Sequence, residues 1–163
     1  EEHESYASDD SFPMKPQRIL NDVRKVMGRE DIVISDVGAH KMWIARHYNC
    51  YEPNTCVISN GFATMGISVP GAIGAKLVYP EKKILAVCGD GGFMMNCQEF
   101  ETALRVKAPF VTLIFNDSSY GLIKWKQMEL LRRFYKSGFC EVCGKYGGNW
   151  LPHHKSRRAG ANP

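Results

Sequence analysis

The sequence predicts an α/β fold, a three-layer sandwich in which helices cover both faces of a parallel sheet. Short apolar, β-branched runs alternate with helix-length segments between residues 15 and 134, which is the order found in βαβ units. The clearest runs, at 83–88 and 110–115, are apolar at almost every position. Strands covered on both faces have this composition, and a helical crossover between two strands makes them parallel.

Each element has a local reason. Ile19, Leu20 and Val23 recur at helical spacing, and Gly28 follows as a stop signal. A glycine-rich tight turn over 89–92 leads from a strand into an amphipathic helix, and Pro70 is expected to kink the helix that contains it. The predicted elements are helices over 15–27, 40–48, 66–79, 96–107 and 121–134, and strands over 31–37, 55–59, 83–88 and 110–115.

The 163 residues suit one domain, flanked by two tails. We expect an acidic tail over 1–14, the globular domain over 15–136, and a disordered basic tail over 137–163. The net charge of +4 comes from the end of the chain, because residues 1–123 hold 12 Lys and Arg against 15 Asp and Glu, whereas 124–163 hold 9 against 2. The basic charge therefore says little about what the domain binds.

Composition also limits the location and the partners. No apolar run approaches the length of about 20 residues that a membrane-spanning helix needs, and nothing resembles a secretory signal. The six cysteines do not form the pattern of a disulfide framework, which favours a reducing, cytoplasmic location. We expect neither nucleic acid nor membrane as a partner.

The basic tail leaves a second interpretation open. Cys140, Cys143, His153 and His154 are the residue types of a zinc site. Their spacing differs from that of zinc fingers, in which the two histidines are three to five residues apart rather than adjacent. A disordered tail without metal is the alternative, because this segment offers little apolar surface to bury.

Polar residues follow three of the predicted strands, at the sheet edge where open α/β folds bind ligands. They lie in the segments 36–40, 89–92 and 116–121. A glycine-rich turn that enters a helix presents backbone N–H groups to a phosphate, and Asp90 and Asp117 add carboxylate oxygens. Mg²⁺ prefers one or two carboxylates together with phosphate oxygens. The residues thus indicate a Mg²⁺-bridged phosphate or diphosphate site, with ordinary solvated turns as the alternative.

The motif spacing resembles that of a known family. Gly89-Asp90-Gly91, 24 further residues and Asn116-Asp117 are similar to the signature of thiamine-diphosphate-dependent enzymes. The stretches DVGAHKMWIARHY, SNGFATMGISVPGAIGAKLVYP and GDGGFMMNCQEFETALRVKAP resemble the C-terminal cofactor domain of acetolactate synthase large chains. The resemblance covers residues 15–134. After that point the family continues with further strands, which 137–163 do not show, so we expect the domain to be incomplete at its C-terminus.

The resemblance implies a role for each matching residue. Mg²⁺ would be held by the side chains of Asp90 and Asp117 and by the backbone carbonyl of Ser119. Met65 would lie under thiamine diphosphate and keep it bent, and the backbone of Ala63 and Met65 would bind its aminopyrimidine ring. The residues expected to bind or line the diphosphate are Gly38, Ala39, His40, Gly91, Gly92, Tyr120 and Gly121.

The resemblance also implies an activity: decarboxylation of pyruvate and its condensation with a second 2-oxoacid to give acetolactate, a product used in branched-chain amino acid biosynthesis or acetoin formation. In this family a glutamate on a separate pyrimidine-binding domain, usually from a partner subunit, activates the cofactor. Glu99 and Glu101 do not match that glutamate, so we expect no catalytic residue in this chain and a homo-oligomer in the full enzyme. Another 2-oxoacid decarboxylase or carboligase, and a non-catalytic truncated chain, are the alternatives.

Overall fold

A four-stranded parallel sheet forms the centre of the protein in the computed structural model, which describes residues 9–136. Its strands lie in the order β2-β1-β3-β4. Their bounds are Ile32–Ser35 for β1, Cys56–Ile58 for β2, Ile84–Gly89 for β3 and Val111–Phe115 for β4. The predicted parallel sheet is confirmed, and each strand lies within or next to the segment predicted for it.

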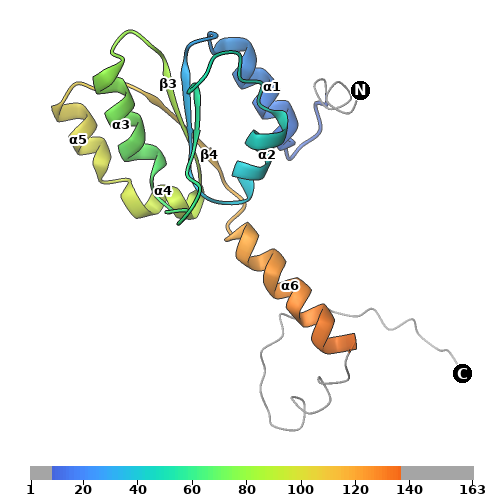
Figure 1. Ribbon diagram of the computed structural model, residues 1–163. Coiled ribbons are helices and arrows are strands. Elements are labelled where there is room, and N and C mark those ends of the chain that lie inside the picture. The colour runs from blue at the N-terminus through green and yellow to red at the C-terminus, as the bar shows by residue number, and fades with distance from the viewer. Residues whose placement is uncertain (1–8, 137–163) are drawn as a thin grey trace, which may run out of the picture. The chain divides into compact units, whose positions relative to one another are not determined.

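Helices cover both faces of this sheet (Figure 1). One face carries α1 (Pro16–Val26) and α2 (Ala39–His47), and the other carries α3 (Ser68–Val78), α4 (Asp90–Asn96) and α5 (Glu99–Arg105). The predicted three-layer α/β architecture is therefore confirmed. The chain divides into two compact units, Glu1–Lys124 and Trp125–Pro163, and the first holds the whole sheet. A last helix, α6 (Gly121–Lys136), begins in the first unit and ends in the second.

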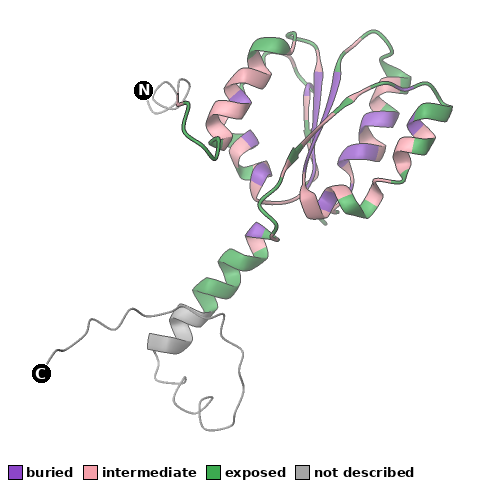
Figure 2. Cartoon of the chain, turned by 180° about the vertical axis from the view of Figure 1, so that it is seen from behind, coloured by how far each residue is buried: buried purple, intermediate pink, exposed green. Residues whose placement is uncertain are grey.

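Successive side chains of the two central strands, β1 and β3, point alternately to the two faces of the sheet and so contribute to two separate core clusters. Val33, Leu85 and Val87 pack with Leu20 of α1 and Ile44 of α2. The neighbouring strand residues face the other layer, where they pack with Ala72 of α3; these are Ile32, Ile34, Ile84 and Ala86. Figure 2 shows the central strands in purple, between helices whose residues range from buried (purple) to exposed (green). All four residues of β1 are buried, as expected for a central strand with both faces covered.

Two local predictions were wrong. The segment expected as a tight turn at 89–92 is instead the start of a helix, α4, which begins directly at Asp90. The helix expected over 96–107 is shorter than predicted, because α5 covers only Glu99–Arg105. At the start of α5, the Phe100 and Glu101 amides bond three residues back, to the carbonyls of Cys97 and Gln98. Phe100 stacks on Phe110, with ring centroids 5.6 Å apart.

Pro70 does not interrupt α3. It is the third residue of a helix that runs unbroken from Ser68 to Val78. The first turn of a helix has no acceptors for its N–H groups, so a proline there removes no hydrogen bond.

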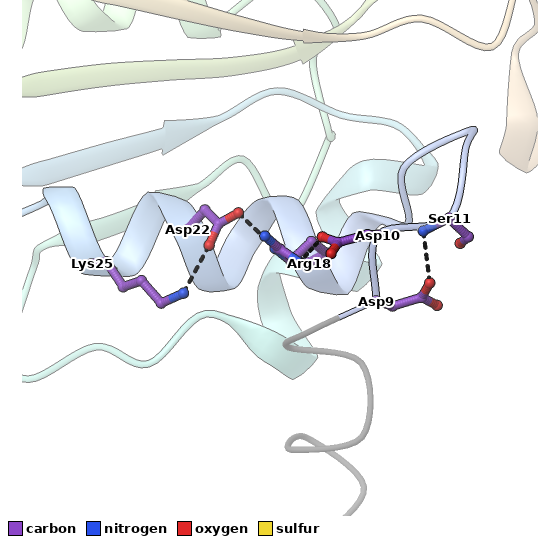
Figure 3. A network of polar contacts seen from close by, with 6 residues as sticks. All are labelled: Asp9, Asp10, Ser11, Arg18, Asp22 and Lys25. Carbon is purple, nitrogen blue, oxygen red and sulfur yellow. Dashed lines mark hydrogen bonds and ion pairs between the residues drawn. The ribbon is translucent and has the colours of Figure 1, made fainter.

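The described end of the N-terminal segment is tied to α1 by a polar network (Figure 3). Arg18 is its centre, with Nη1 2.7 Å from Asp10 Oδ1 and Nε 2.8 Å from Asp22 Oδ2. Lys25 Nζ lies 2.9 Å from the other oxygen of Asp22, and the hydrogen bonds from Lys25 and Arg18 lower the pKa of that carboxyl. Residues 9–14 are thus held at the start of the first helix.

The described cysteines are free; Cys88 is buried, Cys56 and Cys97 are partly covered, and Cys50 is exposed. Burial raises the pKa of Cys56 to about 12 and that of Cys88 to about 11. Both thiols therefore stay protonated at neutral pH and pack as small apolar groups. Within residues 9–136, no helix is long and apolar enough to cross a membrane. Cys140 and Cys143, with the predicted tail that contains them, lie outside the described residues.

Candidate cofactor site

The carboxyl ends of the parallel strands bring the three polar segments to one edge of the sheet. β1 leads into residues 36–40, β3 into Asp90 and the glycines that follow it, and β4 into 116–121. β3 lies between β1 and β4, so all three segments are neighbours. This edge is where open α/β sheets bind ligands.

A cleft of about 730 Å³ opens at this edge. It contains all but one of the residues that the sequence predicts for the site. The predicted residues that line it are Gly38, Ala39, His40, Met65, Asp90, Gly91, Gly92, Asp117, Ser119, Tyr120 and Gly121. Three apolar residues of the N-terminal segment, Phe12, Pro13 and Met14, also line it, although that segment was expected only as a tail.

The glycines after β3 are required by close contacts. A Cβ atom at Gly91 would lie 2.4 Å from Cε1 of Tyr120, and one at Gly92 would lie 3.1 Å from the carboxyl carbon of Asp36. Because no side chain fits at either position without displacing a neighbour, the two glycines allow the start of α4 to pack closely against Tyr120 and Asp36. Both glycines line the cleft, and a diphosphate, which binds through backbone N–H groups, suits a glycine-rich segment of this kind.

The loop after β4 holds its polar side chains by local hydrogen bonds. Asn116 Oδ1 accepts from the Ser118 amide at 3.1 Å, and Asp117 Oδ1 accepts from the Ser119 amide at 3.2 Å. These bonds turn the chain so that Asp117 and Ser119 both line the cleft. Asp90 and Asp117 therefore reach one cleft from the ends of two adjacent strands.

This donor set suits a cation shared with a ligand. Among the described residues, no group of three or more His, Cys, Asp or Glu side chains forms a complete metal cage. Mg²⁺ does not need one, because it is usually held by one or two carboxylates, waters and substrate phosphates. Asp90, Asp117 and the Ser119 carbonyl, the predicted ligands, would leave room for diphosphate oxygens around such an ion.

His40 lies at the back of the cleft rather than in solvent. It is 5% exposed, its Nε2 is 3.0 Å from the Asp36 carbonyl, and its ring stacks on Phe115 at 6.2 Å. A carbonyl only accepts, so Nε2–H donates this bond. Burial lowers the pKa of His40, and the neutral imidazole is therefore the form that the folded protein favours.

Met65 and Ala63 lie in the loop between β2 and α3. Met65 is half-buried and lines the cleft. Ala63 adopts a left-handed backbone with φ 50° and is not among the lining residues. The structure thus brings Met65 to the other predicted residues, whereas Ala63 is set back from them.

Sequence reasoning assigned no role to Asp36. Its side chain is fully buried, and it accepts four hydrogen bonds at the end of β1. The available signal was a charged residue directly after four apolar or small residues of a central strand, a position where an unpaired carboxylate would be costly.

A cleft with two carboxylates and a glycine-rich segment at this edge of the sheet is typical of α/β domains that bind a Mg²⁺-diphosphate group. Residues 36–152 match the family described as "Thiamine pyrophosphate enzyme, C-terminal TPP binding domain". The chain belongs to this family, and its cofactors are thiamine diphosphate and Mg²⁺. The match continues past residue 136, where we placed the end of the domain, so that boundary stays a prediction.

The chain is also similar to individual enzymes. It is 42% identical over 118 residues to "Acetolactate synthase" of Bacillus subtilis, a match that covers 72% of this chain and 21% of that protein. It is 36% identical over 145 residues to "Probable acetolactate synthase large subunit" of Methanococcus aeolicus, covering 85% of this chain and 23% of the relative. A third relative, "Acetolactate synthase, catabolic" of Raoultella terrigena, is 34% identical over 122 residues, a match that covers 75% of this chain and 22% of that protein. The chain thus spans about a fifth of the length of the curated relatives it matches.

Proposed function

We propose that this domain binds the diphosphate end of thiamine diphosphate in an acetolactate-synthase-like enzyme, which decarboxylates pyruvate and condenses the product with a second 2-oxoacid. The observation that carries the proposal is the placement of Asp90 and Asp117 at the ends of β3 and β4, on one cleft. The 42% identity to an acetolactate synthase supports this reaction over others of the family.

The residues of the cleft divide the task of binding. Asp90, Asp117 and the Ser119 carbonyl hold Mg²⁺, and the backbones of Gly91 and Gly92 bind the diphosphate. The remaining residues line the cleft around the diphosphate and exclude water from it; they are Gly38, Ala39, His40, Tyr120 and Gly121. Met65 supports the bent cofactor from below, and the Ala63 backbone assists at the pyrimidine end.

When bound, thiamine diphosphate would supply a nucleophilic carbon and an electron sink for the decarboxylation of a 2-oxoacid. The domain contributes orientation and a water-excluding surface. Among the described residues that line the cleft, the carboxylates are those of Asp90 and Asp117; Glu99 and Glu101 belong to α5 and do not line it. We therefore assign the glutamate that activates the aminopyrimidine to a pyrimidine-binding domain, from a second copy of the enzyme or another chain.

Cofactor binding tests the metal site directly. Isothermal titration of the chain with thiamine diphosphate should show binding in Mg²⁺ that disappears with a chelator. Asp90→Ala should weaken binding by roughly tenfold or more, since it removes a charged ligand. Ser119→Ala is the matched control, because it keeps the backbone carbonyl and should change little. Equal affinity with and without metal would overturn the proposed site.

Reconstitution tests the reaction. Mixing the chain with a pyrimidine-binding domain from a relative and assaying acetolactate from pyruvate should give activity that neither part shows alone. Activity of the pure chain would contradict the assignment of the glutamate. Cofactor binding without activity in any mixture would favour the non-catalytic candidate, and product from other 2-oxoacids alone would favour a different carboligase or decarboxylase.

A cytoplasmic location and a homo-oligomeric full enzyme complete the proposal. The described thiols are unpaired, which fits a reducing compartment. The cleft offers diphosphate ligands without an activating glutamate among its described lining residues, which fits a site completed by another domain or subunit.

A further inference from the structure

We propose that Asp36 and Asn96, which lie outside the cleft lining, are positioning residues that hold the Gly66 peptide and thereby present the adjacent Met65 to the cleft. The inference rests on the proposed cofactor site. It concerns how the chain keeps one wall of that site in place.

Asp36 binds a segment that is distant in the sequence. Its Oδ1 accepts from the Gly66 amide at 2.8 Å, and its Oδ2 accepts from the Ser68 hydroxyl at 3.0 Å and the Ser68 amide at 3.3 Å. The Val37 amide donates a fourth bond, at 2.6 Å. All four partners are donors and the side chain is fully buried, so both oxygens act as acceptors with no access to solvent.

Asn96 holds the same residue from the opposite side. Its Nδ2 donates to the Gly66 carbonyl at 2.7 Å. Gly66 has φ 87°, and a Cβ atom there would lie 2.6 Å from Asn96 Nδ2 and 3.1 Å from Met95 Cβ. The N–H and the C=O of one glycine are thus bound by side chains from two different elements, the end of β1 and the end of α4.

The bonds from Asp36 and Asn96 to the Gly66 peptide, together called the Gly66 clamp, control where Met65 lies. Gly66 connects Met65, which lines the cleft, to the start of α3. Neither Asp36 nor Asn96 lines the cleft, so neither can contact the cofactor there. Gly61, Phe62 and Thr64 of the loop from 61 to 66 are exposed, so the bonds to the buried Gly66 hold the end of the loop that carries Met65. Releasing Gly66 should therefore disturb the cofactor wall formed by Met65 and leave Asp90 and Asp117 in place.

Two variants test the clamp from its two sides. Asp36→Asn replaces one acceptor by a donor, and Asn96→Ala removes the bond to the Gly66 carbonyl without touching Asp36. Met94→Ala, at an exposed position of α4, is the matched control. In the cofactor-free chain, amide hydrogen exchange at Gly66 should accelerate roughly tenfold or more in both variants, with exchange at Ala86 of β3 unchanged. If Asp36→Asn does not fold, Asn96→Ala alone decides the result.

Binding of two ligands adds the second readout. In Mg²⁺, both variants should bind thiamine diphosphate roughly tenfold more weakly, whereas their affinity for inorganic diphosphate, which does not reach Met65, should stay within about twofold of the wild type. Unchanged exchange at Gly66, or an equal loss for both ligands, would overturn the inference. If the wild-type chain binds neither ligand, the proposed function fails, and the exchange rates still decide whether Asp36 and Asn96 hold the peptide.

Discussion

The fold keeps the His40 side chain neutral by burying it. The ring is covered by Phe115 and by the backbone around Gly38 and Gly89, and its Nε2–H is committed to the Asp36 carbonyl. A proton added to Nδ1 would place a charge where water cannot solvate it. Burial therefore lowers the pKa of His40 from its ordinary value of 6.5.

This burial makes stability depend on pH below neutrality. The unfolded chain binds a proton to His40 more readily than the folded chain, so the stability contributed by the neutral ring is complete above pH 6.5 and declines as the pH falls from there toward the folded pKa. The free energy of unfolding, measured by urea titration, should fall between pH 7.5 and 5.5. The fall should be smaller in His40→Gln, which still donates to the Asp36 carbonyl but does not titrate. An identical fall in both proteins would contradict this.

Substitutions at two glycines of the same loop distinguish the cost of backbone strain from the cost of close packing. Gly61 and Gly66 both have positive φ, 73° and 87°, but a Cβ atom meets nothing within 4 Å at Gly61. Gly61→Ala should cost only the strain of a left-handed backbone, about 1–2 kcal/mol. Gly66→Ala should cost a further 1–3 kcal/mol or so, because Asn96 and Met95 must move. Thermal or chemical denaturation measures both, and equal losses would show that the Gly66 contact can relax.

At the scale of the element, the buried faces of the helices determine how strongly each one is held. Helix α1 contributes Leu20, which is 1% exposed, to the core between the sheet and α2. The same helix ends in Val26, which is 67% exposed. Its polar contacts with residues 9–14 are at the surface and contribute little to stability.

Truncation of these two side chains should therefore have very different effects. Leu20→Ala should lower the free energy of unfolding by about 2–5 kcal/mol, since it leaves a cavity under the sheet. Val26→Ala should change it by less than about 0.5 kcal/mol. Chemical denaturation of both variants provides the comparison, and a small effect of Leu20→Ala would mean that α1 is not part of the cooperative core.

The elements were predictable where the signal is local. The apolar runs predicted all four strands, because strands of a parallel sheet in an α/β domain tend to have apolar residues at consecutive positions. Helix α4 was missed, because Gly91 and Gly92 have poor helix propensity and tertiary contacts override it, whereas α5 lies within the helix predicted over 96–107. Asp36 could be seen as a polar residue at a strand end, but its partners Gly66 and Ser68 are neighbours only in the folded chain. The roles of the cleft residues, Ala63 included, stay predictions.

At the scale of the whole molecule, the proposed site predicts that the metal, the cofactor and the fold are coupled. Asp90 and Asp117 are presented by different strands, so a ligand that joins them binds the folded chain and not the unfolded one. Such a ligand stabilises the protein by mass action. At the proposed site, this stabilisation should require both carboxylates and the cation.

Thermal unfolding should report this coupling without any assay of activity. At about 100 times the dissociation constant, thiamine diphosphate with Mg²⁺ should add about 2.7 kcal/mol to the stability and raise the melting temperature. Each ligand added alone should have a much smaller effect. Asp117→Asn should abolish the combined shift, whereas Asn116→Ala, at its neighbour, should reduce it less. A full shift with the cofactor in the presence of a chelator would be inconsistent with a shared metal.

The order of the strands also affects the chain while it is being made. β1 lies between β2 and β3, and Ile32 pairs with Ile84, so the central strand emerges from the ribosome long before its second partner. At about 5–20 residues per second, this delay is roughly 3–10 s. During that time a strand that is fully buried in the finished protein has no neighbour on one side. The nascent chain therefore exposes an apolar strand during this delay, whereas a protein built of β-hairpins would have paired it as soon as the next strand emerged.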